Sequence, residues 1–235
     1  MFMPGAFNFG YCHHVTYFGY VSPVSATILL GVEGVKSRRA EYAEQTRAAI
    51  LAAAAAAFAE QGYTATSITR IAEVARVTKG AVYHHFSDKQ SLFEAVINHY
   101  NEVAQQKVYQ AIAGHVDDVW GAATAALEAA LDVCADPIAG RLIYLEGPTG
   151  LGWKRWRESE RQYTHQNVRH LLLQGIQAGI FAADAPTAAM TDILAGMVTH
   201  AGIALAEAPS RRRKRIRRDL QLAIHRVLQG LRSDN

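Results

Sequence analysis

One short segment, residues 67–92, constrains the fold of this 235-residue chain more than any other. Its sequence is SITRIAEVARVTKGAVYHHFSDKQSL. Apolar residues at positions 68, 71, 72 and 75 follow the period of an amphipathic helix, and Ser67 stands before them as an N-cap. Thr78 takes the same place before a second short helix, expected over 79–85. Two short helices joined by a tight turn predict a helix-turn-helix.

The second of these helices has a polar outer face. Val82 and Phe86 are expected to face inward, which leaves Lys79, Tyr83 and His84 outside or at the rim. Lysine can donate to the O6 and N7 atoms of guanine, and tyrosine suits phosphate oxygens. Because Lys79 and His84 have no role in a core, the pattern predicts a helix that enters the major groove of DNA.

Residues 44–104 closely resemble the DNA-binding domain of TetR-type repressors. The pattern that carries the resemblance is TSITRIAEVARVTKGAVYHHFSDKQSLF, in which Tyr83, Phe86 and Lys89 stand at the family's distance from the IAEVA helix and from Gly62. The resemblance implies contacts with base edges for four residues, Lys79, Gly80, Ala81 and His84. It implies phosphate contacts for Ser67, Tyr83 and Lys89, with Thr69, Thr78 and His85 nearby.

The turn between the two short helices departs from the family. This turn usually carries glycine, and here it carries Arg76. A non-glycine residue at positive φ costs roughly 1 kcal/mol, so we expect local strain at this position. A contact between the Arg76 guanidinium and a DNA phosphate would recover part of that cost.

The rest of the chain after residue 37 is also expected to be helical, so the predicted fold class is all-α. Apolar periodicity predicts further helices over about 41–61, 89–113, 117–135, 153–178, 184–206 and 211–231, with EGPTGLG at 146–152 as a turn between helices. We expect three parts. They are an extension over 1–37, a helix-turn-helix DNA-binding domain over 38–104, and an effector-binding and dimerisation domain over 105–235.

The first 36 residues are rich in glycine and aromatics and almost free of charge, and they predict a poorly ordered extension. A metal site at Cys12, His13 and His14 is disfavoured because adjacent side chains rarely converge on one ion, and no cofactor is expected. No apolar run reaches about 18 residues, and no Lys or Arg precedes Lys36. The chain is therefore expected to have no membrane span or signal peptide and to be cytoplasmic.

From about residue 105 the resemblance fades. It implies a helical domain that binds a small-molecule effector and dimerises through its last two helices. The candidates for lining the effector pocket are His99, Tyr100, Trp120, Tyr144, Trp153, Trp156 and Tyr163. A mostly apolar cavity with a few polar anchors would suit a lipophilic or aromatic effector.

The last two expected helices each carry an apolar stripe. The first consists of Met190, Ile193, Leu194, Met197 and Ile203, and the second of Leu220, Ala223, Ile224, Val227 and Leu231. Paired with their symmetry mates, the two helices would form a four-helix interface, and the alternative is packing inside one protomer. The cationic run RRRKRIRR at 211–218 is interpreted as the solvated start of the last helix, with a second nucleic-acid patch as the alternative.

These features predict a homodimeric, ligand-responsive transcriptional repressor that a small molecule releases from a palindromic double-stranded DNA operator. The long helix at 89–113 would act as the lever between effector and DNA. An enzyme is disfavoured because the chain lacks a Ser/His/Asp or Cys/His set and paired carboxylates in apolar surroundings. A ligand-binding dimer without DNA affinity remains the second interpretation.

Overall fold

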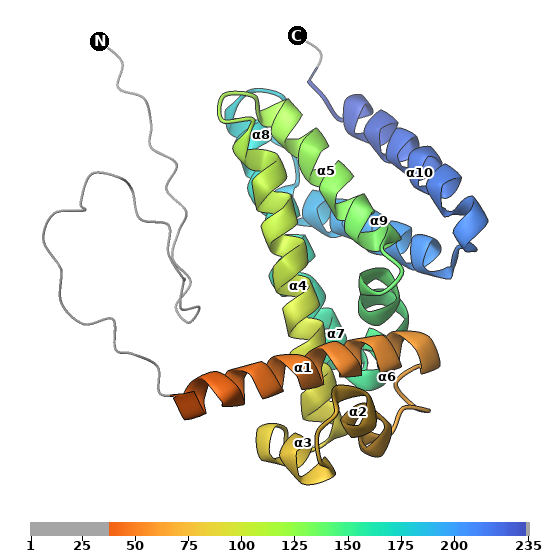
Figure 1. Ribbon diagram of the computed structural model, residues 1–235. Coiled ribbons are helices and arrows are strands. Elements are labelled where there is room, and N and C mark those ends of the chain that lie inside the picture. Colours follow the sequence, from red (N-terminus) through yellow and green to blue (C-terminus); the bar gives the residue numbers. More distant parts are fainter. Residues whose placement is uncertain (1–37, 234–235) are drawn as a thin grey trace, which may run out of the picture.

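The computed structural model describes residues 38–233, and the regular structure in this range is helical (Figure 1). The lower part of the molecule is a head made of α1 (Arg38–Gln61), α2 (Ile68–Ala75) and α3 (Lys79–His85). The long helix α4 (Lys89–Ala113) starts in this head and runs up into the rest of the molecule. The domain boundary expected at residue 104 therefore falls inside α4, which belongs to both parts.

The upper part is a bundle around α4. Its elements are α5 (Val119–Ala135), the π-helix η1 (Arg141–Glu146), α6 (Gly147–Gly150), α7 (Trp153–Glu160), the π-helix η2 (Arg161–His165), α8 (Gln166–Gln177), α9 (Thr187–Glu207) and α10 (Ser210–Gly230). Within residues 38–233 the strand geometry is limited to one isolated bridge between Phe181 and Arg232. The predicted all-α fold class is confirmed.

The caps of the helix-turn-helix form as the sequence predicts. The Ser67 hydroxyl accepts a hydrogen bond from the Arg70 backbone N–H, and the Thr78 hydroxyl accepts one from that of Ala81. Arg76 lies in the left-handed region, with φ 57° and ψ 40°, and its N–H closes the end of α2. The strain expected at this turn is therefore present in the backbone.

Three aromatic rings join α1, the loop after it and the first turns of α4. Phe58 and Phe93 meet edge to face with 5.0 Å between ring centroids, and Tyr63 lies 4.9 Å from Phe93. Phe58 and Phe93 are completely buried. Edge-to-face pairs of this kind contribute about 0.5–1.5 kcal/mol beyond the burial of their area, so this cluster fixes the angle at which α1 crosses α4.

The segment expected to be a turn at 146–152 is mostly helical. Residues 147–150 form α6, and the chain turns only at Gly152, where φ is 79°. The helix is possible because Pro148 stands in its first turn, where a missing N–H costs nothing. Glycine is needed at position 150 because a Cβ there would lie 2.3 Å from the Phe93 ring. The close contact between α6 and α4 thus depends on Gly150.

The helix expected over 153–178 is interrupted by a wider turn. α7 and α8 continue one another, but η2 lies between them with π-helical hydrogen bonding. Single π turns inside α-helices occur often at functional sites, and nothing in apolar periodicity marks them.

The helix α9 is more apolar than we expect from the sequence patterns. Among the described residues it is the one helix long and apolar enough to cross a membrane by length and composition, with a mean hydropathy of 1.4. The prediction that no apolar run reaches about 18 residues is therefore wrong for α9. The apolar character has a use inside the protein, because α9 packs against α5, α8 and η1 and buries Leu194, Ala195, Ala201 and Leu205.

The cationic run at the start of α10 is mostly solvated, as expected. Arg211, Arg212, Lys214, Arg215 and Arg218 are exposed. Arg213 and Arg217 are partly buried exceptions. The Arg213 guanidinium donates to the carbonyls of Leu205 and Ala208 and so completes the end of α9, and Arg217 forms an ion pair with Asp132 of α5.

We expect Arg76→Gly to stabilise the protein by up to about 1 kcal/mol, because glycine adopts the left-handed conformation without a Cβ clash. Thermal unfolding measures this as a rise of about 2–4 °C for a chain of this size. The variant is also expected to bind DNA with a shallower salt dependence, since a phosphate contact is lost.

Arg76→Ala is the matched control for this pair of effects. It removes the same charge but keeps a Cβ, so the salt dependence should change while the stability gain should be absent. A stabilised Arg76→Gly protein with an unchanged salt dependence would leave the strain explanation intact and reject the phosphate contact.

Candidate functional site

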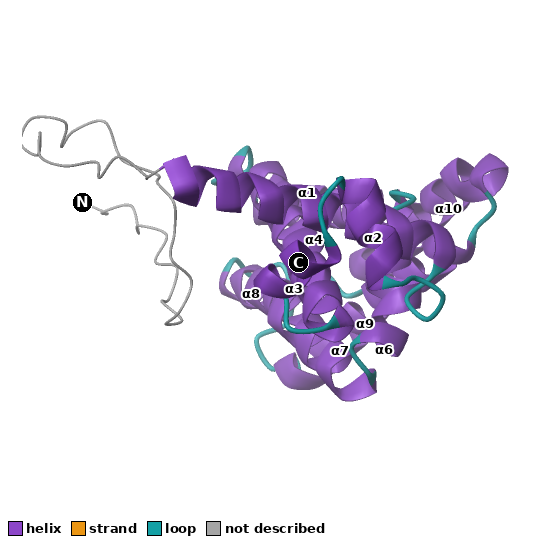
Figure 2. Cartoon of the chain, turned by 60° about the horizontal axis from the view of Figure 1, so that its bottom comes forward, coloured by secondary structure: helices purple, strands orange, loops and turns teal. Residues whose placement is uncertain are grey.

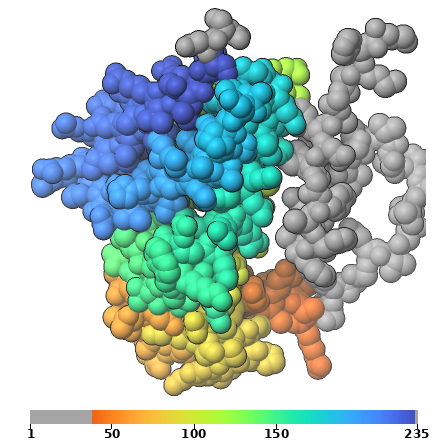
Figure 3. Space-filling view, turned by 180° about the vertical axis from the view of Figure 1, so that it is seen from behind, coloured from red at the N-terminus to blue at the C-terminus, as the bar shows by residue number. Residues whose placement is uncertain are grey.

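The lower end of the head presents α2 and α3 to the outside. Figure 2 turns this end toward the viewer, and Figure 3 shows the segment that includes α3, in yellow, at the lowest surface of the molecule. Val82 and Phe86 face the core and are buried, as predicted. Most residues predicted for DNA contact are exposed, namely Ser67, Thr69, Thr78, Lys79, Gly80, Tyr83 and His84, while Ala81, His85 and Lys89 are partly buried.

Gly80 lies on the open face of α3 without a packing reason for being glycine. A Cβ at this position would meet nothing closer than the Thr78 hydroxyl, 3.8 Å away. Glycine in a helix costs roughly 0.5–1 kcal/mol relative to alanine. The missing side chain leaves room for an external surface to approach the backbone of α3.

The basic and aromatic groups around α3 are close to one another. The Lys79 ammonium lies 5.9 Å from the centroid of the Tyr83 ring, and the Arg47 guanidinium lies 5.2 Å from that of Phe86. Burial, with the nearby His84 and Arg47, lowers the pKa of His85 below its usual range. At neutral pH His85 is therefore a neutral hydrogen-bonding group beside the cations.

Lys89 has a structural role that sequence reasoning missed. Its ammonium donates to the backbone carbonyls of Tyr63, Thr64 and Thr66 at 3.0, 3.3 and 3.1 Å. An ammonium has three donors, and all three are used here. Lys89 thus ties the loop between α1 and α2 to the start of α4, and the phosphate contact implied by the family resemblance would require one of these bonds to be exchanged.

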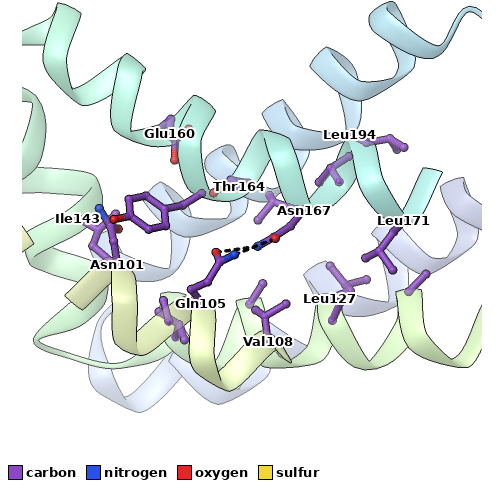
Figure 4. A pocket seen from close by; sticks show the side chains of 18 of the residues that line it. Asn101, Gln105, Val108, Leu127, Ile143, Glu160, Thr164, Asn167, Leu171 and Leu194 are labelled. Carbon is purple, nitrogen blue, oxygen red and sulfur yellow. Dashed lines mark hydrogen bonds between the residues drawn. The ribbon is translucent and has the colours of Figure 1, made fainter. Parts of the chain in front are cut away.

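The upper bundle encloses a cavity of about 150 Å³ between α4, α5, η1 and the helices from α7 to α10 (Figure 4). Most of its wall is apolar. The apolar lining includes Ile97, Val108, Leu127, Val133, Leu171, Leu172, Phe181, Leu194, Val198, Ile224 and Leu228. An apolar cavity inside a helical bundle is a common form of small-molecule site.

Polar side chains line one part of this cavity and are mostly paired with each other. The Gln105 and Asn167 amides exchange two hydrogen bonds of 3.1 and 3.0 Å, which cross the view in Figure 4. The Asn101 amide donates to the Ser159 hydroxyl at 2.8 Å. Glu160 is 8% exposed and accepts a hydrogen bond from the Thr199 hydroxyl.

The structure brings three of the seven predicted pocket residues to the cavity, Tyr144, Trp156 and Tyr163. The other four, His99, Tyr100, Trp120 and Trp153, do not line it. Trp153 is 66% exposed, Trp120 lies against His225 and under the Arg232 guanidinium, and the His99 ring lies against that of Tyr100. The presence of an aromatic residue does not show whether its side of the helix faces the cavity.

The polar lining residues were missed, although the sequence carries a signal for them. Asn101 and Gln105 are four residues apart on the otherwise apolar face of α4, and the run Ser159, Tyr163, Asn167 has the same spacing. Polar residues that recur at i and i+4 inside an apolar stripe face the same interior space.

The η1 helix connects the cavity to the head. Ile143 and Tyr144 line the cavity, and the Trp156 indole N–H donates to the Ile143 carbonyl at 2.8 Å. At the other end of η1, the Glu146 carboxylate accepts a 2.8 Å hydrogen bond from the Tyr63 backbone N–H. One short helix thus contacts both the cavity and the loop that Lys89 holds.

Within residues 38–233 no three His, Cys, Asp or Glu side chains are grouped so that they could hold a metal ion. Cys12, His13 and His14 lie outside the described residues.

Comparison with known proteins gives the family. The model of the bacterial regulatory proteins of the tetR family matches residues 50–96, and that of the tetracyclin repressor-like C-terminal domain matches residues 120–231. The chain belongs to the TetR family. It is a DNA-binding transcriptional regulator with a helix-turn-helix head and a C-terminal helical domain.

Solved and curated relatives of this TetR-family regulator agree with that assignment. A TetR-family transcriptional regulator from Pectobacterium atrosepticum has a TM-score of 0.68 and 27% identity, over 83% of this chain and 97% of that chain. The transposon Tn10 TetC protein of Escherichia coli is 26% identical over 142 residues, which are 60% of this chain and 71% of TetC. TtgR, an HTH-type transcriptional regulator of Pseudomonas putida, is 43% identical over 65 residues, 28% of this chain and 31% of TtgR.

The structure divides the apolar stripes of the regulator's last two helices. Leu194 and Ile224 are buried and line the cavity, so these two members of the stripes pack inside the protomer, which is the alternative for them. Ile193, Val227 and Leu231 are exposed, at 64%, 45% and 36%, and so is Leu222, which the stripe omitted. Large apolar side chains thus remain exposed on both α9 and α10.

We expect Lys89→Met to destabilise the regulator by about 2 kcal/mol, because three carbonyls, two of them in partly buried hydrogen bonds, lose a charged donor while the aliphatic stem is kept. Chemical unfolding measures the change. Lys107→Met, an exposed lysine on the same helix, is the control and should be neutral within about 0.5 kcal/mol. Equal stabilities of the two variants would mean that water replaces the ammonium without loss.

Proposed function

We propose that this regulator is a homodimeric repressor that binds a near-palindromic DNA operator and leaves it when a small molecule enters the cavity. The observation that carries the proposal is the open face of α3, where the backbone at Gly80 is uncovered between Lys79 and the exposed His84. The family consists of transcriptional regulators rather than enzymes, and one relative, BepR of Brucella suis, is named a transcriptional repressor. Cytoplasmic location follows from the same proposal.

Contacts of the head with DNA follow from the chemistry of its surface. Lys79 and His84 would donate to base edges in the major groove, and the Ala81 methyl would touch a thymine methyl. Ser67 and Tyr83 would bind phosphates and set the register. Two heads would sit in successive major grooves of one duplex, about one helical turn apart.

Dimerisation through α9 and α10 is supported by the residues on these helices that the protomer leaves exposed. Ile193 of α9 and Leu222 and Val227 of α10 are large apolar side chains that the protomer leaves exposed. Gly196, in the middle of α9, would meet nothing within 4 Å if it carried a Cβ, so packing inside the protomer does not require glycine there. A partner helix approaching closely would require it.

The DNA-binding proposal predicts opposite effects of Gly80→Ala on binding and on stability. Operator affinity should fall about tenfold or more, because a methyl group blocks the approach of DNA to α3, while stability stays equal or rises by up to about 1 kcal/mol. The operator is first obtained by selection from random duplexes, and affinity is then measured by fluorescence anisotropy. Salt dependence of binding is recorded in the same assay.

Gly114→Ala is the matched control, since a Cβ there also meets open space but lies far from α3 along α4. It should leave affinity unchanged. If no duplex is selected, or if binding is insensitive to salt, the protein is a ligand-binding dimer without DNA affinity.

Release by a ligand requires a route from the cavity to the head, and η1 supplies one. A ligand against Ile143 and Tyr144 would displace η1, and Glu146 would pass the shift to the Tyr63 N–H. Tyr63 lies in the loop that Lys89 anchors to α4, so the lever expected in α4 and this contact act at the same place.

We therefore expect Glu146→Ala to weaken coupling rather than ligand binding. Coupling between two sites is typically about 1–3 kcal/mol, so a compound that lowers operator affinity up to about a hundredfold should lower it far less in the variant. The compound is found by screening against the operator complex, and its direct affinity is measured by calorimetry. Glu158→Ala, an exposed neighbour of the cavity, is the control. Full release in Glu146→Ala would remove η1 from the route.

A further inference from the structure

The cavity contains one acidic group that its surroundings leave incompletely satisfied. Glu160 lines the cavity and is 8% exposed, and one carboxylate oxygen accepts a hydrogen bond from Thr199. Among the described residues, the other oxygen has no hydrogen-bond donor and Glu160 has no ion pair. A buried carboxylate is stable only when paired or hydrogen-bonded, so this oxygen can accept a donor from outside the chain.

The nearest positive charge does not compensate Glu160. Arg157 stands one turn earlier on α7, is exposed, and lies 6.0 Å from the centroid of the Trp153 ring. Burial raises the pKa of Glu160, while the Thr199 hydrogen bond and the Arg157 charge oppose that rise. The carboxylate therefore sits in a site where an incoming cation would gain more than at the surface.

Four other polar side chains of the cavity are already bonded in pairs. The Gln105 and Asn167 amides bind each other, and so do Asn101 and Ser159. Glu160 is the charged residue of the described cavity lining, and one of its oxygens is open to a ligand donor. Figure 4 shows Glu160 on the side of the cavity opposite Asn101 and Gln105, with Leu127, Leu171 and Leu194 at the apolar end.

The size of the cavity limits the apolar part of a ligand. A cavity of about 150 Å³ lined by aliphatic and aromatic side chains holds a single benzene ring. The volume here is the same, about 150 Å³. A large lipid or a multi-ring compound would exceed this volume.

We propose that the cavity binds a compact primary amine in its ammonium form, with the ammonium on the Glu160 carboxylate and a body of about one ring among the leucines. This inference rests on the proposed function of the cavity as the effector site. It narrows the ligand to one chemical class. Uncharged and anionic compounds of similar size are expected to bind more weakly, because they bring no positive charge to the buried Glu160 carboxylate.

Calorimetry on the full chain tests the proposal with three probes of similar size that each carry one benzene ring, benzylamine, benzyl alcohol and benzoate. Benzylamine is expected to bind about tenfold or more tightly than benzyl alcohol, a difference of about 1.4 kcal/mol, and benzoate most weakly. In Glu160→Gln, which keeps the shape and an acceptor for Thr199, benzylamine and benzyl alcohol should bind within about twofold of each other. Glu158→Gln, on the exposed side of α7, should keep the wild-type order.

Circular dichroism checks whether Glu160→Gln is folded. If that variant folds poorly, the three probes on the unaltered chain still test whether the cavity prefers an amine. Equal binding of the amine and the alcohol, stronger binding of benzoate, or no binding of any probe overturns the proposal. Operator release is measured separately. An amine that binds through Glu160 but leaves the DNA complex intact supports the amine site and removes the effector role from the proposed function.

Discussion

The position of the Phe93 ring is the constraint on which the rest of the structure depends. The ring is fully buried where three parts of the chain meet, with Phe58 of α1 and Tyr63 of the following loop on one side. Gly150 of α6 lies on the other, with no room for a Cβ. Packed interiors are dense and respond to displacement as units, so α1, α4 and α6 cannot shift independently. The DNA-reading head is therefore held by the same ring that touches the bundle enclosing the cavity.

Polar contacts reinforce this junction and connect it to the wall of the cavity. Lys89 holds the loop after α1 through three carbonyls, and Glu146 holds the same loop through the Tyr63 N–H. Both anchors lie at the junction, but Glu146 belongs to a helix whose other residues line the cavity. In the proposed mechanism, a change in the cavity wall would reach the head over this six-residue helix, without first passing along the length of α4.

Local signals were sufficient to predict the head, and they were insufficient for the cavity. The caps at Ser67 and Thr78 and the positive φ at Arg76 depend on residues within a few positions of each other. The cavity depends on helix rotation, which composition does not encode, so Trp153 proved exposed while Glu160 proved buried. The helical GPTG segment was missed because its glycines serve close packing against distant residues rather than a turn.

The π-helical turn η2 gives this family member an unusual route to altered ligand preference. Each residue of a helix turns it by about 100°, and a π turn holds one residue more than regular winding requires. Deleting a single codon within 161–165 would remove that extra residue and restore regular winding, while α8 would keep the same face toward the cavity. Asn167, Leu171 and Leu172 would stay in the cavity wall, and deletion of Tyr163 or Thr164 would remove one lining side chain. A new receptor specificity could thus arise in one genetic step, with every residue of the DNA-reading head unchanged.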